Sequence, residues 1–567
     1  MNQLPPEWAD PSVADESLSP RDLTRRGLLR GLGLLGIGVG FQVAGSATGM
    51  FGAGSAFAAA STGTAAAGST TDDPALVYLV GDHHVHSVYS HDAKYSFSQL
   101  TKAAQDHGLD WLAFTEHSNW GHANAGGALD EHREILAARN ENPRMLVFQG
   151  LEWYIPAAEH ATVLVAPGPS EARLLRSFEL AFDGKLLGYT EGSVGHPDTA
   201  RNRAHALAAL QWLAARKADG TIDDVIVLAN HPARLGIDSP EEIRDWRDAA
   251  AGIMVGMEGA PGSQGAAIPG WRGSNSVRGE YENSPTAQTW PGFPSEAFVT
   301  YGGFDWMTAT VGGMWDAMLS EGKGWWITSN SDVHRVVFDK WANGTMPAGL
   351  TFDTAGRLAD PVLTDSPQPG SDFWPGQFSR THVGVESLGY LEVMAALRTG
   401  RVWVDHGHLI DALDVRLIVD GQSTRGVTLG GRLTVTKGTP ITLQVTITAA
   451  TRPNFNGDVP KLANVDLIRG AVTGAAPDRT QWTAPDTRVV EHRDVSAKGG
   501  TFTLTFPITD VQSSFYLRLR GGDGKRTGTG LLGAQIDAYA PQAHPKGDGN
   551  PWVDLWFYAN PIFVDVV

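Results

Sequence analysis

The sequence contains no cysteine among its 567 residues. This absence excludes disulfides, thiolate zinc sites, cysteine nucleophiles and a lipid-modified cysteine anchor. Any transition-metal site must therefore be built from His, Asp and Glu side chains. Basic residues are also few, because 44 Lys and Arg stand against 62 Asp and Glu, giving a formal net charge of −18. Such an acidic chain lacks the general positive surface that nucleic acid or an anionic membrane requires.

Long apolar runs are rare as well. Beyond the N-terminal region, no run approaches the roughly 20 apolar residues of a membrane span. Near the N-terminus, Arg25 and Arg26 precede a glycine-rich, mildly apolar stretch, and small residues follow up to positions 58–60. This pattern predicts a Tat-type signal peptide over 1–60 and hence a secreted protein. The alternative is an uncleaved membrane anchor, which the glycines in the apolar stretch disfavour.

A linker of Ser, Thr, Ala and Gly over 61–74 leads into seven short apolar runs, most of them followed by a helical pattern. The runs are ALVYLV (75–80), LDWLAFT (109–115), RMLVFQG (144–150), ATVLVA (161–166), DVIVLAN (224–230), GIMVGME (252–258) and GWWITS (324–329). The candidate helices are 96–108, 129–140, 200–217, 239–250 and 305–321. Strands that alternate with helices predict parallel βα units, and therefore an α/β fold class.

The pattern changes in the last third of the chain. From about residue 411, apolar and polar residues alternate with period two between Gly, Asp and Pro turns, which predicts an antiparallel β-sandwich over 401–567. The region before it, 75–400, carries a Pro- and Gly-rich insertion over 336–386 and a helix over 387–400. We expect the sandwich to cap the first domain or to bind a polymer.

Histidines and carboxylates gather near the ends of the apolar runs. The first run continues as GDHHVHSVYSHDA (81–93), with four His and two Asp. Side chains alternate along a strand, so His84 and His86 point the same way and His83 the other, and we expect His83 to be half-exposed under the strand. His160 precedes its run instead, so we expect it to arrive from a loop. The residues that follow a run are His84, His86, His117, Glu152, His231, Asp332 and His334.

The C-terminal ends of parallel strands meet at one edge of a sheet, where the chemistry of α/β barrels sits. A cluster of His and carboxylates there predicts a metal centre that suits Zn, Mn or Fe(II). The alternative is a set of unrelated surface histidines. Arg234 and Arg335, each just beyond such a motif, could grip a phosphate. Glu258, at the end of the sixth run, could be a general acid or a support for a ligand.

Several of these motifs resemble those of the polymerase-and-histidinol-phosphatase (PHP) family. GDHHVHSVYSHDA resembles the first family motif and AFTEHSN the second; QGLEW, ANHP and NSDVH resemble the later ones, in family order. The resemblance implies a distorted (β/α)7 TIM-like barrel that binds two to three divalent metal ions and hydrolyses its substrate. Glu116 stands where the family more often has Asp, and we expect it to support a ligand from behind.

The resemblance also implies which residues bind the metals. A first group would be His84, His86, Glu152 and Asp332; a second Glu152, His160 and His231; a third His117, His334 and one residue from the end of the first motif. For that last position Asp92 is favoured over its neighbour His91. The predicted catalytic residues are Glu152, His334, Arg234 and Arg335.

The sequence therefore predicts an exported metal-dependent hydrolase, most simply a phosphoesterase, acting on a small anionic substrate. Metal ions lower the pKa of water and neutralise charge on the attacked centre, so no Ser–His–Asp triad is required. Two alternatives stay open: a carbamate, ester or amide hydrolase on the same metal site, and a carbohydrate- or surface-binding protein whose first domain is inactive.

Overall fold

The computed structural model describes residues 73–567, apart from 119–121, 123, 270–275, 280–283, 423–424 and 548. The predicted signal peptide, 1–60, and almost all of the predicted linker lie outside the described residues. Within the part that is described, no helix combines the length and apolar character needed to cross a membrane.

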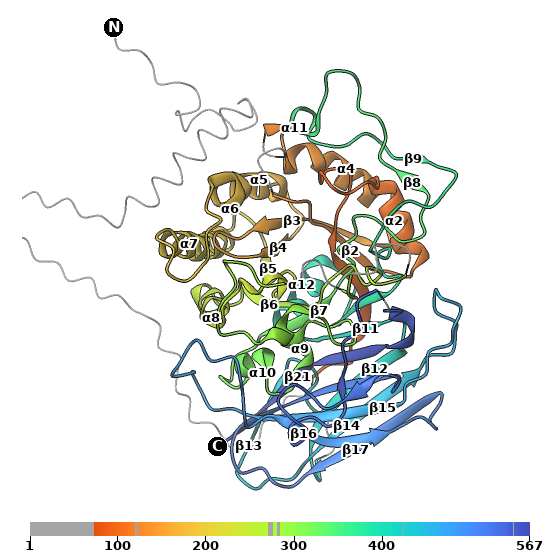
Figure 1. The fold of residues 1–567 in the computed structure, drawn as a ribbon. Coiled ribbons are helices and arrows are strands. Elements are labelled where there is room, and N and C mark those ends of the chain that lie inside the picture. Colours follow the sequence, from red (N-terminus) through yellow and green to blue (C-terminus); the bar gives the residue numbers. More distant parts are fainter. Residues whose placement is uncertain are drawn as a thin grey trace, which may run out of the picture.

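All seven predicted runs form strands, which confirms the α/β class, and these strands follow one another in chain order within one sheet. They are β1 (Val77–Val85), β2 (Trp111–Phe114), β3 (Leu146–Tyr154), β4 (His160–Val165), β5 (Val225–Ala229), β6 (Met254–Ala260) and β7 (Trp326–Ser329). Helices lie along the outside of this sheet (Figure 1). They are α2 (Phe97–Asp106), α4 (Ala128–Glu141), α5 (Glu171–Phe182), α6 (Gly184–Leu187), α7 (Thr199–Ala218), α8 (Pro240–Ala249), α9 (Trp306–Ala309), α10 (Met314–Leu319) and α12 (Tyr390–Thr399).

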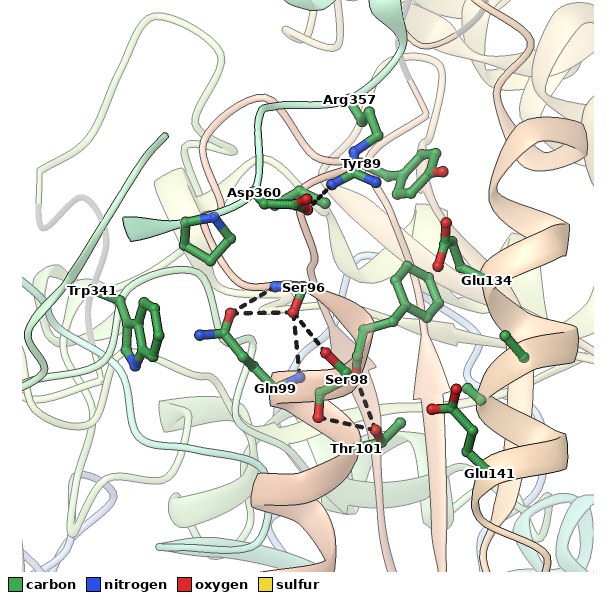
Figure 2. A pocket seen from close by; sticks show the side chains of 15 residues that line it. Tyr89, Ser96, Ser98, Gln99, Thr101, Glu134, Glu141, Trp341, Arg357 and Asp360 are labelled. Carbon is green, nitrogen blue, oxygen red and sulfur yellow. Dashed lines mark hydrogen bonds and ion pairs between the residues drawn. The ribbon is translucent and has the colours of Figure 1, made fainter. Parts of the chain in front are cut away.

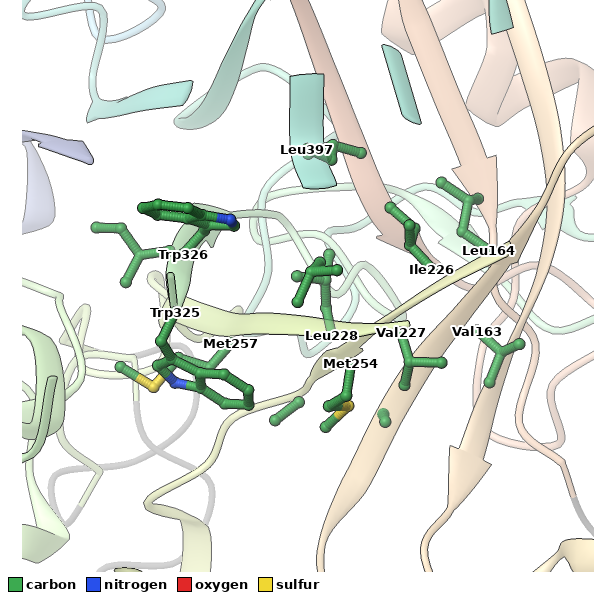
Figure 3. Packing of buried hydrophobic residues seen from close by; sticks show 14 of the residues in the cluster. Val163, Leu164, Ile226, Val227, Leu228, Met254, Met257, Trp325, Trp326 and Leu397 are labelled. Atoms are coloured by element: carbon green, nitrogen blue, oxygen red, sulfur yellow. The ribbon is translucent and has the colours of Figure 1, made fainter. Parts of the chain in front are cut away.

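The strands are apolar on both faces because both faces are covered. Figure 3 shows Val163 and Leu164 of β4, Ile226 of β5 and Met254 of β6 packed in one cluster. Leu397 of α12 lies on the opposite side of these strands from Met254 (Figure 3). This is the environment that near-continuous apolar runs predict.

The prediction of a single helix over 305–321 was wrong. Two short helices, α9 and α10, replace it, and the turn between them contains Gly312 at φ +76° and Gly313. Glycine readily adopts this left-handed conformation, which ends a helix. The sequence reading also missed α5, which lies between β4 and β5.

β4 runs antiparallel to both neighbours, which corrects the prediction that the strands are all parallel. It follows β3 as a hairpin without an intervening helix. The first residue of β4, His160, therefore lies at the same edge as the last residues of β3 and β5. His160 is the first residue of the strand, so the prediction that a loop carries it was wrong.

His83 is fully buried, so its predicted half-exposed position was wrong. The ladder between β1 and β2 shifts register after Asp82, leaving two residues of β1 opposite one of β2. Such a bulge breaks the alternation of side chains. The His83 ring reaches Thr328 Oγ1 of β7 at 2.8 Å and Thr162 Oγ1 of β4 at 3.3 Å. The sheet thus curls until β1, β4 and β7 face one another.

The same sheet continues into the C-terminal region without a break. From β1 it runs through β10, β11, β21, β18, β15 and β16, all antiparallel, and β13 pairs with β21 in parallel. The bounds are β10 (Ser379–Val385), β11 (Val402–His406), β13 (Arg432–Val435), β15 (Asn464–Ala471), β16 (Arg488–Asp494), β18 (Phe515–Gly522) and β21 (Trp556–Val566). The predicted border between 400 and 401 thus separates two strands, β10 and β11, that pair with each other.

A second, three-stranded antiparallel sheet covers this C-terminal extension. It consists of β12 (Ile410–Val419), β14 (Ile441–Ala449) and β17 (Thr501–Ile508). Apolar residues of both sheets, such as Leu443 and Leu517, share one buried cluster. The antiparallel strands that the period-two pattern predicts are thus present, and side chains of both sheets pack into one core.

Side chains take the place of a strand along the outer edge of β7. Asn560 of β21 accepts from the Ile327 N–H at 2.9 Å and donates to the Ile327 carbonyl at 3.2 Å. Thr381 of β10 accepts from the Ser329 N–H at 2.8 Å and donates to the Ser329 carbonyl. The C-terminal strands thus satisfy the backbone of the strand that leads to Asp332.

A buried ion pair connects α10 with β18 of the C-terminal region. Asp316 of α10 accepts two hydrogen bonds from the Arg518 guanidinium of β18, at 2.8 and 2.6 Å, and one from the Tyr516 hydroxyl at 2.9 Å. Asp316 and Arg518 are almost completely buried. Breaking such a pair leaves one buried charge without compensation.

The predicted insertion contributes β8 (Trp341–Ala342), β9 (Val362–Leu363) and α11 (Phe352–Ala355) before it reaches β10. Together with α2 and α4 it encloses a hollow of about 500 Å³ (Figure 2). Ser96 and Gln99 on its floor bond each other in the N-terminal cap of α2, and Arg357 pairs with Asp360 on its wall. These polar groups of the hollow thus already bond one another.

We expect Asn560→Leu to lower the free energy of unfolding by about 2–4 kcal/mol, because the buried N–H and carbonyl of Ile327 lose their partners. Urea denaturation of the metal-free protein measures the change. Asn456→Leu, on the surface of the C-terminal region, is the control and should stay within about 0.5 kcal/mol of wild type. Equal stability of Asn560→Leu and wild type would contradict this role of Asn560.

Candidate metal centre

The ends of six strands bring the predicted ligands to one edge of the sheet. β1, β2, β3 and β5 deliver their residues at the C-terminal end, β4 at its N-terminal end, and the loop after β7 supplies the last two. A bridge between Val85 and Val333 holds that loop against β1. The predicted ligands so delivered are His84, His86, Asp92, His117, Glu152, His160, His231, Asp332 and His334.

The first group, His84, His86, Glu152 and Asp332, converges closely. His84 Nε2 lies 2.9 Å from His86 Nε2, 3.1 Å from Glu152 Oε1 and 3.1 Å from Asp332 Oδ1. His86 Nε2 lies 3.2 Å from the same Asp332 oxygen and 3.5 Å from Glu152 Oε2. Donor atoms of four residues, from three strand ends, thus lie close together.

Glu152 is also the centre of the second group. Its Oε1 lies 2.9 Å from His160 Nδ1 and 3.2 Å from His231 Nε2. Asn230, just before His231, donates to the same oxygen at 3.2 Å. One carboxylate is therefore shared between neighbouring groups, as a bridging ligand would be.

In the third group Asp92 is the first-motif residue that reaches the histidines. Its Oδ1 lies 3.3 Å from His117 Nε2 and 3.5 Å from His334 Nε2, and those two nitrogens are 3.2 Å apart. The ring centre of the neighbouring His91 lies 5.5 Å from that of His117. The geometry thus favours Asp92 over His91.

These spacings fit metal ions. Donors that surround a tetrahedral ion at about 2.0–2.1 Å lie about 3.3 Å apart. The contacts of the first and third groups fall between 2.9 and 3.5 Å. A further combination of Glu159, His160 and His231 also has its ligand atoms within 4.8 Å of one another. His nitrogens and carboxylate oxygens without sulfur suit Zn, Mn or Fe(II).

Hydrogen bonds at the ring nitrogens that face away from the centre orient the rings of His86 and His334. His86 Nδ1 meets Ser90 Oγ at 2.9 Å, and Ser90 donates in turn to Glu116 at 2.7 Å. His334 Nδ1 donates to the Asp332 carbonyl at 2.9 Å. A bond at Nδ1 fixes the tautomer and leaves Nε2 for a metal. Glu116 thus lies behind the first motif, where we expected a support.

Two ligand-bearing residues have unusual backbone conformations. His231 has φ +30° and Asp332 φ +45°, which are uncommon for residues other than glycine. Gly262 leaves space for Asp332, because a Cβ atom at position 262 would lie 2.4 Å from the Asp332 Cβ. Backbone strain of this kind persists where the surrounding structure enforces it, typically at functional sites.

The carboxylates of the centre are held ionised. Burial alone would raise the pKa of Glu152, but the rings of His160, His84 and His117 hold it well below its usual range. Asp332 is likewise buried and Asp92 is half-buried, and their histidine neighbours lower the pKa of each. The centre therefore concentrates negative charge that positive charge must balance.

Without metal, that positive charge comes from protons. Burial lowers the pKa of His84, but nearby carboxylates, foremost Asp332, raise it well above the ordinary value. The pKa of His117 and of His231 is also raised, despite burial, by neighbours that include Glu152. A metal ion that bound to these rings would therefore have to displace protons from them.

Three cationic side chains lie around the cluster of predicted metal ligands. The exposed Arg335 donates from Nε to the Asp92 carbonyl at 3.0 Å. Arg234 contacts Glu159 at 2.9 Å. Lys185, which sequence reasoning missed because nothing in the motifs marks it, lies 5.0 Å from the ring centre of Tyr154. The ring centre of Tyr154 lies 4.0 Å from that of His160, with the two rings tilted by 56°, so Tyr154 lines the centre as well.

Comparison with known proteins agrees with the motifs. Residues 82–255 match the family model of the PHP domain. No curated protein matches the chain. A solved two-domain protein from Bacteroides vulgatus ATCC 8482, described as containing a predicted PHP-like metal-dependent phosphoesterase, is 12% identical over 85% of this chain and 99% of its own, with a TM-score of 0.31. The family assignment rests on the domain match and the motifs, not on this low structural likeness.

We expect metal-free protein to lose thermal stability as the pH rises above about 6.5, the ordinary pKa of His. A raised histidine pKa stabilises the fold below that pH, and the contribution is lost as pH rises through the raised value. Metal-loaded protein should keep its melting temperature up to about pH 9, because ions replace the protons. Melting curves of both forms across this range test the prediction, and parallel curves would contradict it.

Proposed function

We propose that this protein is a metal-dependent hydrolase whose substrates are phosphate esters. The observation that carries the proposal is the convergence of His and carboxylate donors, at metal-ligand spacing, on the edge of a PHP domain. Divalent cations bound there would supply Lewis acidity, lowering the pKa of water and neutralising negative charge on a phosphate.

The chain's own residues prepare this chemistry. Asn230 orients the shared Glu152 carboxylate through its amide. Ser90 and the Asp332 carbonyl fix the rings of His86 and His334. Ligands held in this way need no rearrangement when substrate arrives, which favours catalysis by preorganised charge.

The preference for a phosphate ester over a carbonyl substrate rests on the three cationic side chains around the cluster. The protein as a whole repels anions, with a net charge of −18. Arg234, Arg335 and Lys185 nevertheless lie beside the centre, where they would attract and orient an anion. A carbamate, carboxylic ester or amide carries no such charge, and hydrolysis of one of these is the competing outcome of the substrate test.

We expect purified protein to contain two to three equivalents of divalent metal and His84→Ala to contain fewer, because His84 Nε2 faces three other donors of the first group. Elemental analysis after dialysis gives the counts. His196→Ala is the matched control, since this half-exposed histidine contacts only the region around Glu191 and Asp198. Wild-type protein that stays metal-free after reconstitution would refute the hydrolase and favour a binding role.

The substrate class follows from a parallel assay. Metal-loaded protein should hydrolyse aryl phosphate mono- or diesters, and His84→Ala should reduce kcat/KM by at least about 100-fold. Aryl carbamates and carboxylic esters are assayed beside them. Turnover of these and not of phosphate esters would replace the proposed substrate class while leaving the metal-dependent hydrolase in place.

Export by the Tat route is part of the proposal and rests on the sequence alone. Changing Arg25 and Arg26 to Lys should keep the protein inside the cell, because this route reads the twin arginine. Fractionation of cells that express each form measures the effect. Unchanged export would point to another route. Polymer binding by the C-terminal region likewise stays a prediction.

A further inference from the structure

One buried carboxylate touches the centre without belonging to the predicted ligand set. Glu258 lies in β6 and is fully buried. Its Oε1 lies 2.6 Å from His84 Nδ1, and its Oε2 accepts from the main-chain N–H of His231 at 2.6 Å. His84 belongs to the first group and His231 to the second, so Glu258 connects the two groups from behind.

These contacts decide between the two roles open to Glu258. Both carboxylate oxygens face protein partners, at short distances. A general acid needs an oxygen within hydrogen-bond reach of the substrate. Glu258 therefore supports the ligands and does not exchange protons with the substrate.

We propose that Glu258 is a positioning residue that fixes the tautomer of His84 and ties that ring to the main chain of His231. The main-chain N–H of His231 can only donate, so it fixes one carboxylate oxygen. The other oxygen can then accept a hydrogen bond from His84 only if His84 carries a proton on Nδ1. With that proton in place, His84 Nε2 presents its lone pair to Glu152 and Asp332, where a metal ion would bind.

Glu258→Gln should affect one group of predicted ligands and not another. A Gln side chain has one acceptor oxygen and one NH₂ group. Its oxygen must serve the His231 N–H, so the NH₂ faces His84 Nδ1. That contact favours the tautomer with the proton on Nε2, which cannot bind a metal. The first group should lose affinity while the third group, which Glu258 does not touch, should keep its own.

The test measures metal affinity, and rests on the proposed function only in assuming that the centre binds ions. Glu258→Gln is titrated with Zn²⁺ and Mn²⁺ against chelators of graded strength. We expect one class of sites to weaken about 10–100-fold and the rest to stay within about threefold of wild type. Adding Glu258→Gln to His84→Ala should cause little further loss, because both act on one ring.

Two controls separate positioning from general damage. Glu242→Gln changes another buried glutamate, in α8, whose carboxylate lies 3.3 Å from Arg203 instead of contacting a predicted ligand; it should leave metal affinity unchanged. Metal-free Glu258→Gln should melt within a few degrees of wild type. Should it not fold, Glu258→Asp, which keeps the charge but is too short to reach both partners, should show the same selective weakening.

The outcomes are distinguishable. Wild-type affinity in folded Glu258→Gln or Glu258→Asp overturns the inference, and so does equal weakening of all sites. If wild-type protein binds ions and Glu258→Gln loses one class but no phosphate ester is cleaved, the inference holds and the proposed substrate class fails. If wild type cleaves phosphate esters and Glu258→Gln matches it in metal affinity, the proposed substrate class holds and the inference about Glu258 fails.

Discussion

The charge on Glu152 organises the centre. Its carboxylate is almost completely buried and lies against the rings of His84, His117, His160 and His231. A buried carboxylate is costly unless positive charge compensates it. Protonated rings or bound cations are the available compensation, and both require histidines from several strands at one point. The curl of the sheet, the bulge at His83 and the reversal of β4 each serve that requirement.

Much of this arrangement could be predicted from the sequence. Seven apolar runs mark strands buried on both faces, and the ligand types stand at their ends, so the edge of the sheet could be located. What periodicity could not show is local geometry. His83 turns inward because a bulge shifts the register, and His160 reaches the centre because β4 runs antiparallel. The short link between Tyr154 and His160, which leaves no room for a helix, is the sequence signal for that reversal.

The partners behind the ligands were harder to predict, because they are far away in sequence. Glu258 stands 174 positions from His84, and Asn560 stands 233 positions from Ile327. No local pattern links such residues, and only the curled sheet brings them together. For the same reason, a border between domains at residue 400 looked natural from the change in periodicity, although the strands on either side pair with each other.

The place of β21 in the sheet has a consequence for how the protein matures. This strand pairs with β11 and β18, and its Asn560 completes the edge of β7, yet the ribosome makes it after all of these. Contacts between segments so distant in sequence form slowly, because the intervening chain must first be ordered. The β7 edge that leads to Asp332 is therefore completed only after synthesis has passed β21. Any metal ion that needs this completed edge would bind after translation.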